Sequence, residues 1–162
     1  MDAKSLPAFA GLNATQLTNF LAATRPVEIK EGTQLFTHGA LAEDLFFFNQ
    51  GELRVSIDSQ ELAVVPAPCI IGELELFTER PSVATVTALR ACTGIAIKAT
   101  DLRLRLADGD TAALKVIHNI AQVVARRLAA MDQKVTELLE RHGDAPSKDL
   151  QALKAKLFGE WS

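Results

Sequence analysis

The 162-residue sequence has no apolar run that approaches the roughly 18 residues needed to span a membrane. Its first residues, MDAKSLPAFAGL, lack the basic start and the long apolar stretch of a signal peptide. Basic residues are not in excess either, because 17 Lys and Arg stand against 20 Asp and Glu, for a net charge of −3. A nucleic-acid-binding protein usually presents a basic face. We therefore expect a cytoplasmic protein with no membrane and no nucleic-acid partner.

Cysteine and histidine are also scarce. Cys69 and Cys92 are far apart in apolar surroundings, which is typical of buried, reduced thiols rather than of a disulfide or a metal site. Of the three histidines, only His38 falls in the part of the chain with a strand pattern, too few for a metal-binding β-barrel enzyme. No nucleophile elbow or catalytic triad motif is present. We expect no catalytic residues, no metal and no enzymatic activity.

Short runs of alternating apolar and polar residues fill the chain from Pro26 to Lys98, divided by glycine or polar turns. About eight short strands at this spacing are typical of an all-β sandwich, barrel or jelly roll. No long helical insert separates them, so a parallel sheet built from βαβ units is not expected. The predicted strands include residues 27–29, 35–36, 45–48, 53–57, 62–65, 69–71, 84–89 and 94–98.

Helix signals flank the strand region on both sides. Asn13 and Gln16 form a capping-box pattern that predicts a helix over residues 14–24. After the strands, Thr100 is expected to cap a short helix over 101–106, and Asp110 to cap a long one. No glycine or proline occurs from Asp110 to His142, which predicts a single helix of about 50 Å.

The chain therefore divides into one domain and an appendage. We expect the domain to cover residues 1–142, including the long helix 110–142, and a short helical tail to cover 143–162. The tail carries an amphipathic set of apolar side chains, Leu150, Leu153, Leu157, Phe158 and Trp161.

An unbroken heptad pattern runs along the predicted long helix. A second apolar stripe over Val116, Ile120 and Val123 is confined to its first half. We infer that the first half packs on its own domain and on a partner, whereas the second half offers only the heptad seam. A parallel homodimer is predicted, in which Arg127 faces Asp132 of the partner subunit. The seam residues are Leu114, Ile117, Ala121, Val124, Leu128, Met131, Val135 and Leu138.

Residues 70–86 read IIGELELFTERPSVATV. This segment resembles the phosphate-binding cassette of the cyclic-nucleotide-binding domain family, which reads approximately FGELAL, a short spacer and PRAATV. The resemblance covers roughly residues 9–142, and VARRLAAMDQKV (residues 124–135) is similar to the central helix of the catabolite activator proteins. It implies a mainly β fold with flanking helices, a double-stranded β-helix or jelly roll followed by a long C-terminal dimerisation helix.

The resemblance also implies how a ligand is held. In the family, a short helix starts at the Gly-Glu step and presents free N–H groups to a phosphate. The glutamate accepts the ribose 2′-hydroxyl, and an arginine pairs with the cyclic phosphate. The implied ligand-binding positions here are Gly72, Glu73, Leu74, Ser82, Val83 and Ala84. Arg80 lies nearby and could supply the positive charge of the family's arginine.

Three places depart from the family pattern. Ser82 stands at the arginine position, where it can still donate one hydrogen bond, and Glu75 replaces a small residue. Met131 and Asp132 stand where the catabolite activators use hydroxyl residues against the base. Losing a buried charge pair to a phosphate costs several kcal/mol, about a few orders of magnitude in affinity. Tight binding of cyclic AMP by the usual contacts is therefore not expected.

The sequence thus predicts a non-enzymatic regulatory module, homodimeric through its long helix, with a degenerate phosphate-binding cassette. Two alternatives stay open: a signalling protein that binds cAMP, cGMP or a cyclic dinucleotide, and a ligand-free dimeric module for an unknown protein partner. No cofactor is expected besides a possible cyclic nucleotide ligand. Transcription regulators of the family carry a DNA-binding domain after the long helix, and residues 143–162 hold no recognition helix and no arginine, so direct DNA binding is not expected.

Overall fold

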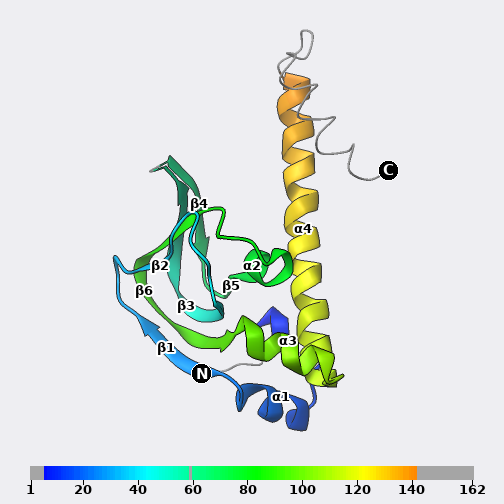
Figure 1. Ribbon diagram of the computed structural model, residues 1–162. Helices are drawn as coiled ribbons and strands as arrows, with labels where there is room; N and C mark the ends of the chain where they lie inside the picture. The colour runs from blue at the N-terminus through cyan, green and yellow to red at the C-terminus, as the bar shows by residue number, and fades with distance from the viewer. Residues whose placement is uncertain (1–5, 59, 142–162) are drawn as a thin grey trace. The chain divides into compact units, whose positions relative to one another are not determined.

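The computed structural model describes residues 6–58 and 60–141 (Figure 1). The predicted tail, 143–162, lies outside the described residues. The chain divides into two compact units, residues 1–122 and 123–162, and α4 belongs to both. The elements are η2 (Pro7–Phe9), α1 (Ala14–Leu21), β1 (Arg25–Ile29), β2 (Gln34–Phe36), β3 (Asp44–Ile57), β4 (Gln60–Pro66), β5 (Cys69–Ile71), α2 (Glu73–Thr78), β6 (Thr85–Lys98), α3 (Ala99–Ala107) and α4 (Thr111–Arg141).

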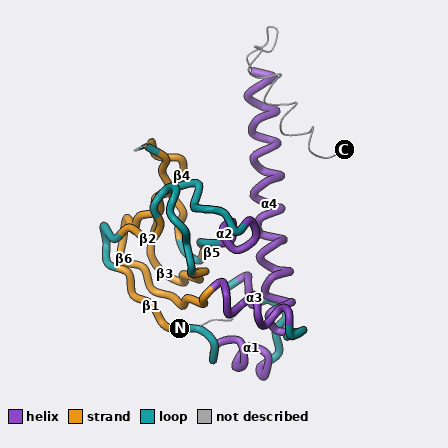
Figure 2. Tube along the Cα trace, viewed as in Figure 1, coloured by secondary structure: helices purple, strands orange, loops and turns teal. Residues whose placement is uncertain are grey.

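The strands form one antiparallel sheet that curls into a roll (Figure 2). Its order is β1-β6-β3-β4, with β2 paired to β6 and β5 paired to β3. Every pairing is antiparallel, which confirms the mainly β jelly-roll prediction. The long strands β3 and β6 pair with each other from Asp44 opposite Lys98 to Ser56 opposite Thr85, so they form the spine of the roll.

Six strands are described rather than about eight, because two predicted breaks are bridged. The runs 45–48 and 53–57 belong to the single strand β3, and the runs 84–89 and 94–98 to β6. The pairing register shifts between Phe48 and Leu53, so irregular residues let the ladder continue through the turn-like Gln50-Gly51 step. Glycine is required at that step, because Gly51 has φ +111° and an added Cβ would lie 2.4 Å from Cys92 Sγ.

Three consecutive phenylalanines in β3 place the core on both faces of the sheet. Because successive strand side chains point to opposite faces, Phe46 and Phe48 share one side, with ring centroids 5.5 Å apart. Phe47 points to the other side and packs on the rings of Phe9 and Phe20, at 5.1 and 6.3 Å. The first part of β3 is therefore buried between the interior of the roll and the N-terminal helices.

Both cysteines are buried, as predicted, and they form no disulfide in the structure. Burial raises the pKa of the Cys92 thiol, and a hydrogen bond to the backbone of Glu52 only partly opposes this. Cys92 therefore stays protonated and unreactive at neutral pH.

The helix boundaries partly follow the sequence signals. In α1, Asn13 Oδ1 accepts from the Gln16 amide at 2.8 Å and Gln16 Oε1 accepts from the Asn13 amide at 3.2 Å, which confirms the capping box. The helix ends at Leu21, earlier than predicted, because turn hydrogen bonds at Ala23 and Thr24 lead directly into β1. Helix α3 begins at Ala99, so Thr100 lies inside it and does not cap it.

The start of α4 is fixed by a cap and by side-chain clamps. Asp110 Oδ1 accepts from the amides of Ala112 and Ala113 at 2.8 and 3.3 Å, as predicted. Asn119 Nδ2 donates to the carbonyls of Ala8 and Ala10 at 3.0 and 2.9 Å. The second apolar stripe is confirmed as a face turned to the body of the domain, because Val116 and Ile120 are fully buried.

Candidate functional site

The segment 70–86 spans β5, α2 and the loop that enters β6, and is called the cassette below. Strand β5 pairs with β3, with Ile71 opposite Phe46, and so delivers Gly72 beside the start of β3. Gly72 has φ +98°, and an added Cβ would lie 2.5 Å from the carbonyl oxygen of Asp44. Only glycine combines this left-handed backbone with so close an approach. The tertiary structure thus requires the glycine of the Gly-Glu step.

Helix α2 presents both a buried and an exposed side. Glu73 and Leu76 are buried, and Glu73 lies in the first turn, where the helix dipole favours a carboxylate. Leu74 and Phe77 are half exposed on the outside of the same helix. The predicted ligand residues Gly72 and Glu73 therefore face inward, whereas Leu74 lies at the surface.

Ser82 is used differently from what the sequence indicates. It is only 3% exposed, and its hydroxyl donates a 2.9 Å hydrogen bond to the carbonyl of Ala84. Its amide donates to the carbonyl of Ala40 at 2.8 Å, and its own carbonyl accepts from the amide of Gly39 at 2.8 Å. A hydroxyl has one hydrogen to donate. The hydroxyl hydrogen of Ser82 is therefore used by the Ala84 carbonyl, and ligand binding by Ser82 stays a prediction.

The remaining predicted cassette residues differ in exposure. Ala84 is buried, whereas Val83 and Arg80 are exposed. The amide of Arg80 donates to Thr78 Oγ1 at 3.4 Å. Within the described part of the chain, the guanidinium of Arg80 forms no ion pair. Arg80 is thus the cassette cation that is free to approach a ligand.

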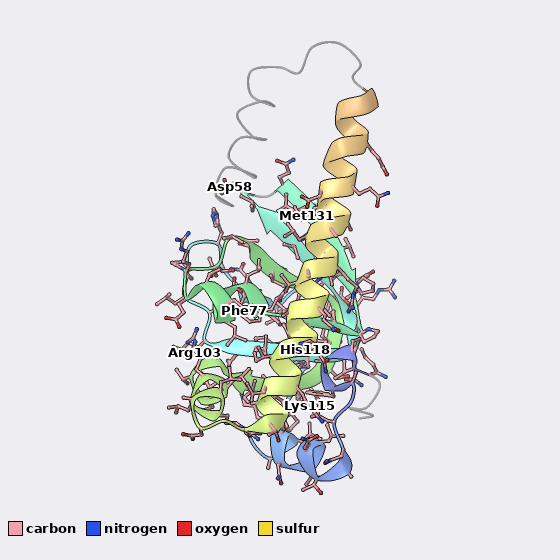
Figure 3. All side chains as sticks on the ribbon, turned by 90° about the vertical axis from the view of Figure 1, so that its right-hand side faces the viewer. Asp58, Phe77, Arg103, Lys115, His118 and Met131 are labelled. Atoms are coloured by element: carbon pink, nitrogen blue, oxygen red, sulfur yellow. The ribbon has the colours of Figure 1, made fainter. Side chains whose placement is uncertain are left out.

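Arg103 in α3 contacts the cassette, although no motif in the sequence pointed to it. Its Nε lies 3.2 Å from Glu79 Oε1, and its Nη2 donates to the carbonyls of Leu76 at 3.1 Å and Glu75 at 3.5 Å. Figure 3 shows the side chains on the ribbon and labels Arg103 and Phe77. A residue 17 positions beyond the end of the motif can be found only once the fold brings α3 beside α2.

A cleft of about 270 Å³ opens near the cassette. Phe36 contributes to its wall, and the Phe36 ring lies 3.1 Å from the position of a Cβ on Gly72. The other lining residues come from β2, the loop after it and the start of β3: Leu35, Thr37, Ala40, Leu41, Ala42, Glu43, Asp44 and Phe46. The cleft is thus a neighbour of the cassette and is lined by none of the predicted ligand residues.

The seam positions of α4 with described side chains are mostly accessible. Leu114, Leu128 and Met131 are 49%, 46% and 65% exposed. Ala121 is exposed as well, and Ile117 and Val124 are partly buried. The side chains of Val135 and Leu138 lie outside the described residues.

The described residues contain neither a candidate metal site nor a membrane-spanning helix. Among them, no group of three or more His, Cys, Asp and Glu side chains could hold a metal ion. None of the described helices combines the length and the apolar character needed to cross a membrane.

Comparison with known families identifies this architecture. The model of the cyclic nucleotide-binding domain matches residues 26–108, which contain the whole cassette and nearly all of the roll. The chain belongs to the cyclic nucleotide-binding domain family. Domains of this family are generally regulatory rather than catalytic. No protein of curated function matched the sequence.

Solved structures agree with the family. The N-terminal domain of a transcriptional regulator from Streptomyces coelicolor A3(2) is 30% identical over 80% of this chain and 95% of that chain, with a TM-score of 0.62. The catabolite activator protein of Thermus thermophilus is 25% identical over 86% of this chain and 73% of that chain, with a TM-score of 0.67. The regulatory domain of Toxoplasma gondii PKA, solved with cAMP, is 28% identical over 62% of this chain and 40% of that chain, with a TM-score of 0.55.

Proposed function

We propose that this cyclic nucleotide-binding domain is a non-enzymatic regulatory module that dimerises through α4 and does not hold a cyclic phosphate by the usual arginine contact. The observation that carries the proposal is the internal use of Ser82. Both of its donors, the amide and the hydroxyl, bind carbonyls of the protein, at Ala40 and Ala84. A phosphate at this position would receive neither a positive charge nor a free hydrogen bond from residue 82.

The charge around α2 supports the same proposal. Glu73, Glu75 and Glu79 bring three carboxylates to the helix and its end, and the guanidinium of Arg103 is already bound to Glu79. An anionic ligand would therefore enter a surrounding that repels it. Losing the arginine–phosphate pair costs several kcal/mol, which lowers affinity by about a few orders of magnitude.

The exposed seam of α4 supports the dimer. Leu128 and Met131 are large apolar side chains on one helix face, and both are about half exposed or more. A helix pair with heptad spacing buries such a stripe and removes it from water. The unpaired residues along the seam thus fit a second copy of the same helix.

A second candidate function is authentic cyclic-nucleotide binding, and Arg80 favours it. Its guanidinium has no partner in the described part of the chain and lies two residues before Ser82. The left-handed Gly72 and the buried Glu73 also match the Gly-Glu step of the family pattern, at which family members bind the phosphate and the ribose. If Arg80 supplies the missing charge, the module binds cAMP, cGMP or a cyclic dinucleotide. If nothing binds, the module is a ligand-free dimer for a protein partner.

Calorimetry separates these functions. We expect no heat with cAMP, cGMP or cyclic di-GMP at high micromolar protein, and tight binding of any of them would overturn the main proposal. Arg80→Gln must abolish any such binding if Arg80 replaces the missing arginine. Ser82→Ala removes only the hydroxyl, and we expect it to leave the response to all three nucleotides unchanged. Ser82→Arg should gain affinity for a cyclic nucleotide if the cassette is correctly assigned. Ala107→Arg adds the same charge at the exposed end of α3, and as the control it should gain none.

Light scattering tests the dimer. We expect a mass of about twice 17.5 kDa for the wild-type chain. Leu128→Glu places a charge in the seam and should give the monomer mass, whereas Ala129→Glu, on the next and exposed position, should stay dimeric. A monomeric wild type, or a dimer that tolerates Leu128→Glu, would reject the seam.

We further propose that the module works in the cytoplasm and has no nucleic-acid partner. The buried thiols of Cys69 and Cys92, which form no disulfide, support a reducing compartment, and the net charge of −3 gives no electrostatic attraction to nucleic acid. In an electrophoretic mobility assay at low salt, random duplex DNA should show no shift when the protein is added.

A further inference from the structure

Helix α2 is too short to be stable by itself. It has six residues, whereas isolated helices below about 12 residues are marginal even in favourable sequences. Both flanking residues have a left-handed backbone, Gly72 at φ +98° and Glu79 at φ +54°. Glycine adopts this conformation freely, but glutamate does so only against a steric cost. The C-terminal end of α2 therefore needs contacts from elsewhere to hold its geometry.

Arg103 supplies those contacts. The last carbonyls of any helix lack partners within the helix. Arg103 Nη2 donates to one of them in α2, at Leu76, and also to the carbonyl of Glu75, which the Glu79 amide already binds. Its Nε pairs with the carboxylate of Glu79 at 3.2 Å. A guanidinium at a helix C-terminus also interacts favourably with the helix dipole. One side chain thus holds the backbone and the strained end residue together.

The same helix α3 is anchored elsewhere by a second arginine. Arg105 Nε donates to Asp110 Oδ2 at 2.6 Å, and its Nη1 donates to the carbonyl of Asn19 at 3.1 Å. Its guanidinium carbon also lies 5.3 Å from the centre of the Phe20 ring. Helix α3 is therefore fixed to α1 and to the cap of α4, and it presents Arg103 to the cassette from that fixed position.

We propose that Arg103 is a positioning residue that, with Glu79, latches the cassette helix α2 onto α3 in the absence of ligand. The latch depends on charge, since the guanidinium, two carbonyls and one carboxylate are its only members. A role of the latch in ligand binding rests on the second candidate function, nucleotide binding by the cassette. The latch itself does not, and it is tested without any ligand.

Hydrogen exchange followed by mass spectrometry measures the latch directly. The informative amides are those of Leu76 and Glu79, which donate to the carbonyls of Gly72 and Glu75. In Arg103→Gln, we expect peptides from residues 72–82 to exchange about tenfold faster than in the wild type. Peptides from β6 should keep their wild-type rate. Arg90→Gln, which removes an arginine paired to Glu52 at 3.4 Å, is the matched control and should leave residues 72–82 unchanged.

Two further variants separate the latch from a general loss of stability. Arg103→Lys keeps the charge but cannot make all three contacts at once, so it should restore part of the protection. Glu79→Gln keeps the fold because the residue is exposed, and it should speed exchange in 72–82 by about threefold. Salt on the order of 1 M should reproduce the Glu79→Gln effect in the wild type and add nothing in Arg103→Gln.

Two results would overturn the proposal. One is unchanged exchange over residues 72–82 in both Arg103→Gln and Glu79→Gln. The other is an increase that is equal in 72–82 and in β6, because that marks global unfolding instead of release of α2. The absence of binding heat with every nucleotide would contradict ligand binding by the cassette, and it would leave the hydrogen-exchange result unaffected. Tight binding of a nucleotide would overturn the main proposed function and would also leave the exchange result unaffected.

Discussion

The backbone of Gly51 lies directly against the side chain of Cys92, so that a Cβ added to Gly51 would be 2.4 Å from the sulfur and 2.7 Å from the Cα of Cys92. Residue 51 carries the irregular part of β3, and Cys92 lies in the middle of β6. The two long strands of the roll therefore approach each other at a point where only a glycine fits.

Gly51→Ala should destabilise the domain by about 3 kcal/mol, because it adds a clash with backbone atoms to a left-handed backbone. Urea unfolding followed by circular dichroism measures the change. Gly32→Ala is the matched control, since Gly32 has φ +80° but no atom within 4 Å of an added Cβ. Its cost should be only about 1 kcal/mol. Equal costs for the two variants would mean that the contact with Cys92 is unimportant.

Asp110 should make stability depend on pH. Burial alone would raise the pKa of its carboxyl, but the hydrogen bonds from Arg105 and from the amides of Ala112 and Ala113 outweigh burial and lower the pKa below its ordinary value of 3.8. A carboxyl whose pKa is lowered by folding stabilises the protein above its unfolded pKa. That contribution is lost as the pH falls through the lower, folded pKa.

Asp110→Asn should therefore be less stable than the wild type by about 1 kcal/mol at pH 7. The difference should shrink as the pH falls from about 4, where the carboxyl of the unfolded chain becomes neutral, through the lower pKa of the folded state. Urea unfolding of both proteins at pH 7 and pH 3 measures it. A difference that does not change with pH would show that charge at Asp110 has no part in capping α4.

Phe47, the β3 phenylalanine on the helix side of the sheet, should be costly to truncate. It is fully buried against Phe9 and Phe20, so Phe47→Ala should lose about 3–5 kcal/mol through lost burial and the cavity left behind. Leu41→Ala removes a comparable apolar side chain that is 76% exposed, and it should change stability by no more than about 0.5 kcal/mol. Thermal unfolding distinguishes them clearly.

Asn119 should hold the N-terminal segment to α4. Its amide donates to the carbonyls of Ala8 and Ala10, so Asn119→Ala should cost about 1–2 kcal/mol and speed amide exchange around η2. Gln122→Ala is the control, because its described side-chain bond is to His118 on the same helix. If both variants leave η2 equally protected, the clamp contributes nothing to the docking of that segment.

Much of the fold could be predicted from local signals. The capping box at Asn13 and the cap at Asp110 are patterns of neighbouring residues, and the structure confirms both of them. The breaks predicted inside β3 and β6 were wrong, because Gln50-Gly51 has the composition of a turn while its actual surroundings are a paired strand. Turn propensity is local, whereas strand pairing is decided by the opposite strand.

The cassette shows the same division. The resemblance of residues 70–86 to the phosphate-binding cassette of the family was visible from their order alone, and the need for glycine at residue 72 follows from its backbone. The acceptor of the Ser82 hydroxyl was not predictable, because the sequence does not show whether the hydroxyl donates to the Ala84 carbonyl, to water or to a ligand. The contact of Arg103 with α2 was not predictable either, since it joins elements that no motif connects.

By itself, the amino-acid sequence determined the type of each element, the faces that become buried and the place of the cassette, because these depend on periodicity and on residues close together in the chain. Only the tertiary structure decided which hydrogen-bond donors of the cassette bind carbonyls of the protein and which cation contacts helix α2. Those outcomes depend on distances between β5, α2, α3 and the loop after β2, and such distances exist only after the roll has closed.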